Sequence, residues 1–258
     1  MSKPKAIVLR TAGTNCDNET AFAFQQSGAE ADIVHVQRLS EQPSLLNEYR
    51  ILALPGGFSY GDDVAAGRVF ANELKCKIGE AIAEFIEAGG LAIGICNGFQ
   101  VMVKMGLLPG PFSISADQEV TLTDNDSNKF EDRWVYLKNV SDKCVFTRGL
   151  EQIYLPIAHG EGKFIAHDES HLDQLEAGGQ VVFRYVSDNG SSADYPWNPN
   201  GSQRDIAGIC DPTGRLLGLM PHPERHFLPF HHPRWTRDGL KVEGDGAALF
   251  KNSVEYFR

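Results

Sequence analysis

The chain has 258 residues, of which 42% are hydrophobic and 22% are charged, and its formal net charge is −10. This is the composition of a globular protein with a sizeable core. The acidic balance argues against sequence-independent binding of nucleic acid, which needs clustered Lys and Arg. No stretch approaches the ~18–20 continuous apolar residues of a membrane helix. The start, MSKPKAIVLR, lacks the apolar core of a secretory signal.

Strand and helix signals alternate along the first hundred residues. Short apolar runs that predict strands cover residues 5–11, 31–37, 49–55 and 91–96. Apolar residues at helical spacing predict helices over 17–26, between 67 and 88, and from 97 onward. Because parallel strands are joined by crossovers, we expect an α/β fold with a mostly parallel central sheet flanked by helices.

The pattern changes after Pro109. Short alternating runs predict antiparallel strands at 119–124, 133–140 and 181–186, and a hairpin is predicted from 206–211 and 214–221 around the turn DPTG. The same pattern predicts a last helix over 245–257 and a long surface loop over 188–205. No repeat or linker interrupts the chain, so we expect a single domain over residues 1–258.

The cysteines are few and scattered. They are Cys16, Cys76, Cys96, Cys144 and Cys210, an odd number without a CxxC pair. This usage favours a reducing compartment, the cytoplasm, over a disulfide framework or a thiolate metal site. A buried, inert thiol is the default expectation for each of them.

Cys96 has the most distinctive setting. Gly94 and Gly98 frame it as G-x-C-x-G where a predicted strand meets a helix, the thiol counterpart of a nucleophile elbow. A side chain at the end of a parallel strand faces the ligand cleft, and a helix N-terminus favours the thiolate. The amide of Asn97 would then face an oxyanion. The alternative is a core cysteine in a strand-to-helix turn with incidental glycines.

The segment MPHPER offers a base for this thiol. Pro221 and Pro223 favour extended conformation in the residues before them, and side chains two apart in an extended chain share a face. Glu224 could therefore fix the tautomer of His222. Two alternatives stay open: a polar turn, or a metal site formed by His222, Glu224 and His226.

A glycine pair marks a second loop at the same predicted sheet edge. Gly56 and Gly57 follow the third strand in ALPGGFSYGDD, and a free glycine amide there could be a second oxyanion donor. An ordinary strand-to-helix turn would also explain them. Asp62 and Asp63 could be a helix-start signal instead of catalytic acids.

Several motifs together resemble the class I (triad-type) glutamine amidotransferases, and within them the glutaminase subunits of phosphoribosylformylglycinamidine synthases. The motifs are GTNCDNE (13–19), LPGGFSYGDD (54–63), GICNGFQ (94–100), HGEGKF (159–164), NPNGS (198–202) and GLMPHPER (218–225). The resemblance spans nearly the whole chain and implies a flavodoxin-like fold. It also implies that Cys96 is the nucleophile, His222 the general acid/base and Glu224 its orienting carboxylate.

The resemblance assigns the substrate contacts as well. It implies that the amides of Gly57 and Asn97 hold the oxyanion. Residues implied to hold the backbone groups of L-glutamine are Gln100 and the loop of His159, Gly160, Glu161 and Gly162.

The implied reaction releases ammonia from glutamine through a cysteine thioester. The ammonia would pass to a partner synthase that converts formylglycinamide ribonucleotide to formylglycinamidine ribonucleotide in de novo purine biosynthesis. The implied partners are a large synthase subunit that uses ATP and magnesium and a small adaptor subunit. This chain has no GxxxxGK[ST] phosphate loop. We expect no cofactor or metal in it, and no nucleic-acid or membrane partner.

Three other functions stay open at this point. The chain could serve a different synthase, which the ammonia acceptor would reveal. It could be a cysteine-elbow hydrolase or peptidase on the same fold, which would not favour glutamine. It could also be a non-catalytic regulatory protein, although such a protein would be expected to have lost part of the triad.

Overall fold

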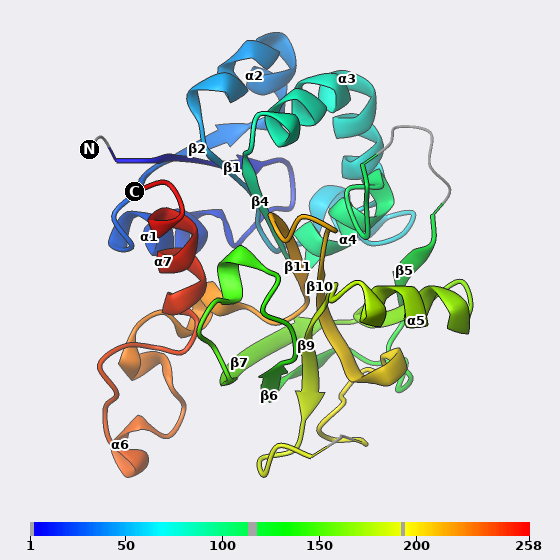
Figure 1. Cartoon of the computed structure of the whole chain (residues 1–258), viewed down its shortest axis with the longest axis vertical. Helices are drawn as coiled ribbons and strands as arrows, with labels where there is room; N and C mark the ends of the chain where they lie inside the picture. The colour runs from blue at the N-terminus through cyan, green and yellow to red at the C-terminus, as the bar shows by residue number, and fades with distance from the viewer. Residues whose placement is uncertain (1–2, 113–117, 192–193) are drawn as a thin grey trace.

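A computed structural model describes residues 3–112, 118–191 and 194–258 (Figure 1). Its first strands are β1 (Lys5–Arg10), β2 (Glu30–His35), β3 (Ile51–Leu54), β4 (Leu91–Ile95), β5 (Val120–Thr123) and β6 (Glu131–Asn139). The later strands are β7 (Gln152–His159), β8 (Lys163–Ala166), β9 (Val181–Val186), β10 (Ile206–Cys210) and β11 (Leu216–Leu219). The α-helices are α1 (Asp17–Gln26), α2 (Val36–Glu41), α3 (Arg68–Glu87), α4 (Asn97–Met105), α5 (Glu169–Ala177), α6 (Trp235–Asp238) and α7 (Ala247–Glu255).

Within these residues the main sheet has nine strands in the order β2-β1-β3-β4-β11-β10-β9-β6-β7. The first five are parallel, and antiparallel pairing starts where β10 and β11 form the predicted hairpin. β5 and β8 form a separate antiparallel pair. Helices α1 and α7 pack together beside the parallel strands, as do α3 and α4 on the other side (Figure 1). The predicted fold class is confirmed.

The central parallel strands β3, β4 and β11 form the core because they carry no polar side chain along their length. β3, β4 and β11 are buried at every residue, as expected for strands covered on both faces. Helices α1 and α3 begin and end within one residue of the predicted positions, and α4 begins at the predicted residue. None of the helices in the described part of the chain is both long enough and apolar enough to cross a membrane.

The structure corrects two local predictions. Residues 36–37 are helical and do not extend strand β2, because the His35 side chain accepts a hydrogen bond from the Gln37 amide (3.2 Å) and caps α2. Part of the segment 188–205 is buried and is not a surface loop: Asn198, Asn200 and Ser202 are all inside. The described part of this segment is anchored by the side-chain amides of Asn198 and Asn200, and Trp197 packs against the core.

Strand β7 is a new element that the sequence pattern did not reveal. It forms one edge of the main sheet, which explains how the strand accommodates Pro156. The free edge of β7 is covered by the segment that follows β11. The His222 amide donates to the Pro156 carbonyl (2.8 Å), and His226 Nδ1 pairs with the Tyr154 carbonyl (2.6 Å). This edge of the sheet therefore positions the segment that carries His222 and Glu224.

Candidate active site

Cys96 lies at a sharp turn between β4 and α4. Its backbone has φ 53° and ψ −107°, which is strained for a residue with a side chain. The Cys96 amide donates to the Leu219 carbonyl of the neighbouring strand (2.8 Å), so the turn is anchored to the sheet. The side chain is 5% exposed, and its sulfur contacts the Ala158 carbonyl at 3.7 Å.

The two flanking glycines are required by close backbone approach. A Cβ atom on Gly98 would lie 1.8 Å from the Leu54 carbonyl oxygen, and one on Gly94 would lie 2.6 Å from the Gly98 carbonyl oxygen. Only glycine permits this packing of the helix start against two strands. The glycines are therefore not incidental, and the elbow interpretation of G-x-C-x-G is supported over that of an ordinary turn.

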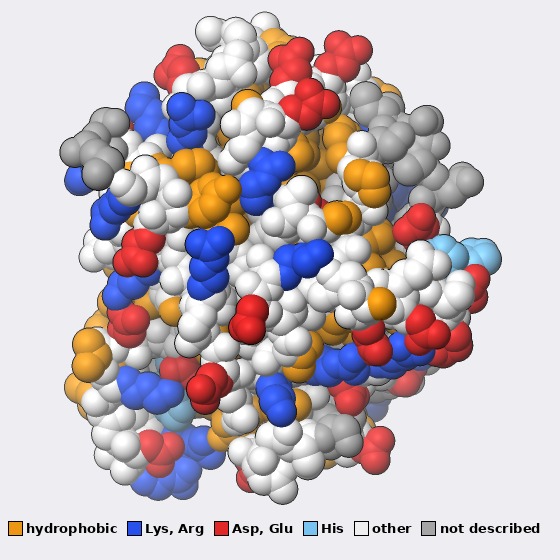
Figure 2. Space-filling model, viewed as in Figure 1, with side chains coloured by type: hydrophobic (Ala, Val, Ile, Leu, Met, Phe, Trp, Pro, Cys, Tyr) orange, Lys and Arg blue, Asp and Glu red, His pale blue; other side chains and the backbone are white. Residues whose placement is uncertain are grey.

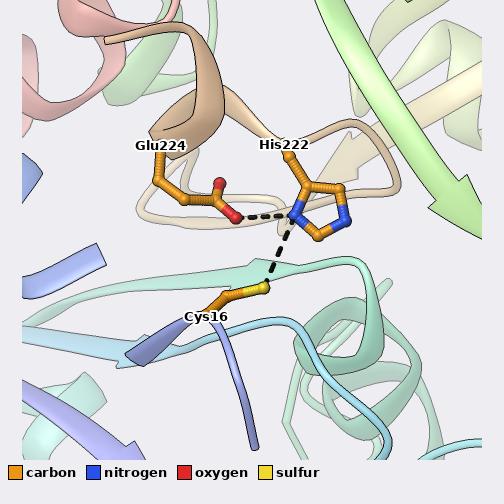
Figure 3. Close-up of side chains that lie close together, drawn as sticks. All are labelled: Cys16, His222 and Glu224. Atoms are coloured by element: carbon orange, nitrogen blue, oxygen red, sulfur yellow. Dashed lines mark hydrogen bonds and ion pairs between the residues drawn. The ribbon is translucent and has the colours of Figure 1, made fainter. Parts of the chain in front are cut away.

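His222 and Glu224 form a buried pair. His222 Nδ1 lies 2.6 Å from Glu224 Oε1, and the two residues are 1% and 2% exposed (Figure 3). The local conformation differs from the expected one. His222 is extended, but Pro223–His226 form a 3₁₀ turn, so Glu224 folds back on the imidazole instead of sharing the face of an extended chain.

The environment of His222 favours its charged form. Burial alone would lower its pKa, but Glu224 and then Cys96 raise it well above the ordinary value. Cys96 and His222 are therefore close enough to interact electrostatically. No nitrogen or oxygen atom of the described residues bonds His222 Nε2. This arrangement suits proton exchange with a thiol and a substrate nitrogen.

The loop after β3 presents an amide to this site. Residues 12–16 hold it in place, since the Phe58 amide donates to the Gly13 carbonyl (2.9 Å) and the Asn15 amide to the Gly56 carbonyl (3.4 Å). Gly57 has φ 148°, and a Cβ on it would lie 2.6 Å from the Gly13 oxygen. Across residues 3–112, 118–191 and 194–258, no hydrogen bond uses the Gly57 amide.

A cavity of about 220 Å³ opens in front of Cys96. It brings together most of the predicted substrate contacts; its lining includes Gly57, Cys96, Gln100, His159, Gly160 and Glu161. Its charged lining residues are Asp62, Asp124 and Glu161, all acidic. The surface of the molecule mixes acidic and basic side chains over most of the face in Figure 2, so this uniformly acidic lining is a local property. Glutamine carries one ammonium group, which such a lining attracts.

The side chains of Asn97 and Gln100 stabilise the walls of this cavity. The Asn97 amide group donates to Gln100 Oε1 (3.0 Å) and accepts from the Ser59 backbone (3.2 Å). Gln100 Nε2 donates to the Glu161 carbonyl (2.5 Å). The elbow, the 58–62 loop and the 159–162 loop are thus tied together.

Asp62 accepts a hydrogen bond from the Gly67 amide (3.2 Å) and does not cap α3, whose N-cap is Gly67.

Sequence reasoning missed the second thiol at the site. Cys16 Sγ lies 3.9 Å from His222 Nδ1 and 3.1 Å from the Arg225 guanidinium (Figure 3). Its side chain, His222 and Glu224 bring potential metal-ligand atoms within 4.8 Å of one another. His226 is not in this group and instead bonds the Tyr154 carbonyl, so the metal set that includes His226 is wrong. The adjacent Arg225 charge opposes a cation at Cys16.

Comparison with known proteins agrees with this geometry. Residues 3–257 match the family model described as a CobB/CobQ-like glutamine amidotransferase domain. A relative in Dehalococcoides mccartyi, named phosphoribosylformylglycinamidine synthase subunit PurQ, is 51% identical over 100% of this chain and 99% of its own length. The chain belongs to this glutamine amidotransferase family. It is a glutamine amidotransferase, and its fold is that of this class.

Other relatives extend the comparison. A protein of the same name in Archaeoglobus fulgidus is 43% identical over 98% of this chain and 96% of its own length. A chain of the structure of PurLQS from Thermotoga maritima has a TM-score of 0.76 and 33% identity, with 100% of both chains covered. Another glutamine amidotransferase from Thermotoga maritima shares the fold alone, with a TM-score of 0.54 at 17% identity over 92% of this chain and 83% of that one.

Proposed function

We propose that the chain is the glutaminase subunit of phosphoribosylformylglycinamidine synthase. It hydrolyses glutamine to glutamate and ammonia, and the ammonia serves the conversion of formylglycinamide ribonucleotide to formylglycinamidine ribonucleotide in purine biosynthesis. The observation that carries the proposal is the elbow thiol of Cys96, which lines a cavity of about 220 Å³ and interacts with the imidazole of the buried His222–Glu224 pair.

In the proposed reaction Cys96 attacks the side-chain amide carbon of glutamine. The carbonyl oxygen takes the negative charge and accepts hydrogen bonds from the Gly57 and Asn97 amides. The C–N bond then breaks as His222 gives a proton to the leaving nitrogen, which leaves as ammonia. His222 next takes a proton from water, the water attacks the γ-glutamyl thioester, and glutamate and the free thiol are released.

The loop of His159, Gly160 and Glu161 borders the position of the substrate. We assign Gly160 and Glu161 to the backbone groups of glutamine, because they line the cavity beside Gln100. Gln100 acts here as a positioning residue, since its side chain already bonds the Glu161 carbonyl and the Asn97 amide.

The ammonia is used by other polypeptides in this proposal. The Thermotoga maritima structure is named for three components, PurL, PurQ and PurS, and we propose the matching large and small partners for this chain. ATP and magnesium bind to the large partner, and this chain supplies no cofactor or metal. We place the reaction in the cytoplasm, because all five cysteines are free thiols that suit a reducing compartment.

We propose that the partner completes the oxyanion hole. Tyr60, Gly61 and Asp62, just after Gly57, all have left-handed φ angles of 55°, 73° and 54°. Such a loop stores strain that a docking partner can redistribute. The isolated chain should therefore be a poor glutaminase.

The test is reconstitution with the two partner proteins. The complex should consume glutamine only when formylglycinamide ribonucleotide and ATP are present, and it should form formylglycinamidine ribonucleotide. Acceptors of other glutamine-dependent synthases should give no product. Efficient turnover with one of those acceptors and none with formylglycinamide ribonucleotide would assign the chain to a different synthase.

A further inference from the structure

The end of strand β7 passes both catalytic side chains. The Pro156 carbonyl accepts a hydrogen bond from the His222 amide (2.8 Å), and the Ala158 carbonyl contacts the Cys96 sulfur (3.7 Å). His159 comes next and is the last residue of the strand. Its ring is 3% exposed and it lines the cavity. An imidazole without a role in the triad therefore lines the same cavity as Cys96.

Asn125 fixes the tautomer of this imidazole. The Asn125 Nδ2 group donates to two carbonyls, those of Lys129 (2.9 Å) and His159 (2.8 Å), which settles the orientation of its amide. Asn125 Oδ1 must then be an acceptor. It receives the Gly162 amide (3.1 Å) and His159 Nδ1 (3.1 Å). Nδ1 therefore carries the proton, and Nε2 presents a lone pair.

The ring is also locked in position. A Cβ atom on Gly162 would lie 2.2 Å from the His159 ring, so the loop closes directly over it. Asn200 holds that loop, since its Nδ2 donates to the Gly162 carbonyl (2.8 Å). The ring is thus held by the two buried amides Asn125 and Asn200, which is the kind of support a preorganised site needs.

The two imidazoles of the site differ in charge. Burial, and then the charge of His222, lower the pKa of His159 to about 3, whereas the pKa of His222 is raised. Pairs of groups whose pKa values are pushed apart in this way have different roles in proton transfer. His159 is neutral at physiological pH. Its Nε2 is buried and has no hydrogen-bond partner among the described residues. Such an acceptor is costly unless a ligand satisfies it.

We propose that His159 is a catalytic and specificity-determining residue whose Nε2 lone pair accepts a hydrogen bond from the side-chain NH₂ of bound glutamine. This inference rests on the proposed function and deepens it. Glutamine offers two donors, its ammonium and its side-chain amide. The acidic groups of the cavity, Asp62, Asp124 and Glu161, suit the ammonium. The side-chain amide must reach Cys96, in the cavity that His159 also lines.

This hydrogen bond has two consequences. Once Cys96 has added to the amide carbon, the hydrogen bond turns the nitrogen of the tetrahedral intermediate so that its lone pair faces the proton of His222. His159 itself stays neutral while the C–N bond breaks, the thioester forms and His222 gives up its proton. It also distinguishes substrate from product. The side-chain carboxylate of glutamate has no donor and would face the lone pair of Nε2. Sites that bond a substrate N–H reject analogues that lack it.

The test compares glutamine with the γ-methyl ester of glutamate, which forms the same thioester but has no N–H at the reacting group. Both are assayed in the assembled three-component complex. His159→Phe keeps a planar ring and removes the acceptor; His159→Gln keeps an acceptor. The glutamine-to-ester ratio of kcat/KM should fall about 10- to 100-fold in His159→Phe and recover in part in His159→Gln. Inhibition by glutamate, relative to the KM for glutamine, should strengthen in His159→Phe.

If His159 had only a structural role, its substitution would lower kcat/KM equally for glutamine and for the ester and leave their ratio unchanged. That result would overturn the inference. If His159→Phe does not fold, the glutamine-to-ester ratio of kcat/KM is compared between His159→Leu and His159→Gln instead. Ester hydrolysis then shows that each variant is intact. The proposed function is tested separately. If wild type and Cys96→Ala consume glutamine equally, the glutaminase assignment fails, whatever the His159 variants do.

Discussion

Replacing Glu224 by Gln isolates the electrostatic part of the triad. The carboxylate lies 2.6 Å from His222 Nδ1, and both groups are buried. Two opposite charges about 4 Å apart attract by about 4 kcal/mol at an effective dielectric of about 20. Because the Glu224 carboxylate raises the pKa of His222 against the effect of burial, removing its charge should lower that pKa. Without the carboxylate charge, burial favours the neutral form of the His222 imidazole.

The rate should fall accordingly. With His222 neutral, Cys96 remains a thiol, and its proton must pass to His222 during the attack, without the Glu224 charge to stabilise the imidazolium. The value of kcat for glutamine should therefore drop ~100-fold or more, within the range of general acid–base catalysis. Steady-state glutamate release by the assembled complex measures this. Glu169→Gln is the matched control, because Glu169 pairs with Arg204 on the surface and its side chain is 74% exposed. Equal rates for Glu224→Gln and Glu169→Gln would refute the electrostatic argument.

Glu224→Gln should also lower the free energy of unfolding, by an amount that depends on pH. The pKa of His222 is raised in the folded state, so its contribution to stability is full below the unfolded value of ~6.5 and is lost as pH rises through the folded value. The loss in free energy of unfolding caused by Glu224→Gln should therefore be larger at pH 6 than at pH 9. Urea unfolding of both proteins at the two pH values measures it; a loss that grew with pH would contradict the sign of the shift.

Three further outcomes follow from the geometry. Gly98→Ala should cost ~100-fold or more in glutaminase rate and lower the Tm, because its Cβ would lie 1.8 Å from the Leu54 oxygen; a wild-type rate would show that the elbow can relax. A diazo-ketone glutamine analogue should label Cys96 alone, and peptide mapping to another cysteine would refute its assignment. His222→Ala should reduce kcat more than Glu224→Ala, because the imidazole itself moves protons and the carboxylate acts through it, by orienting it and favouring its charged form; the reverse order would contradict the general acid/base role of His222.

The parts of the site that sequence predicted are those set by local chemistry. The G-x-C-x-G elbow follows from the backbone angles and close contacts that Gly94 and Gly98 allow, and these act over a few residues. The His222–Glu224 pair was predicted although its local conformation was not. Two residues that are close in the chain can meet in either an extended segment or a 3₁₀ turn.

The parts that sequence did not predict depend on distant contacts. Cys16 meets His222 across 206 positions, and Asn125 meets His159 across 34. No periodicity in one chain encodes such pairs. Strand β7 was missed for a related reason, because Pro156 is compatible with a strand only at a sheet edge, and edge position is a property of the whole fold.

The central claim is that glutamine hydrolysis at Cys96 is separate from the use of its ammonia. The most direct measurement is formation of formylglycinamidine ribonucleotide by the complex carrying Cys96→Ala, with either glutamine or ammonium as nitrogen source. We predict that the glutamine-driven reaction is lost and that the ammonium-driven reaction keeps its wild-type rate. Loss of both reactions in an intact complex, or survival of the glutamine-driven one, would contradict the account.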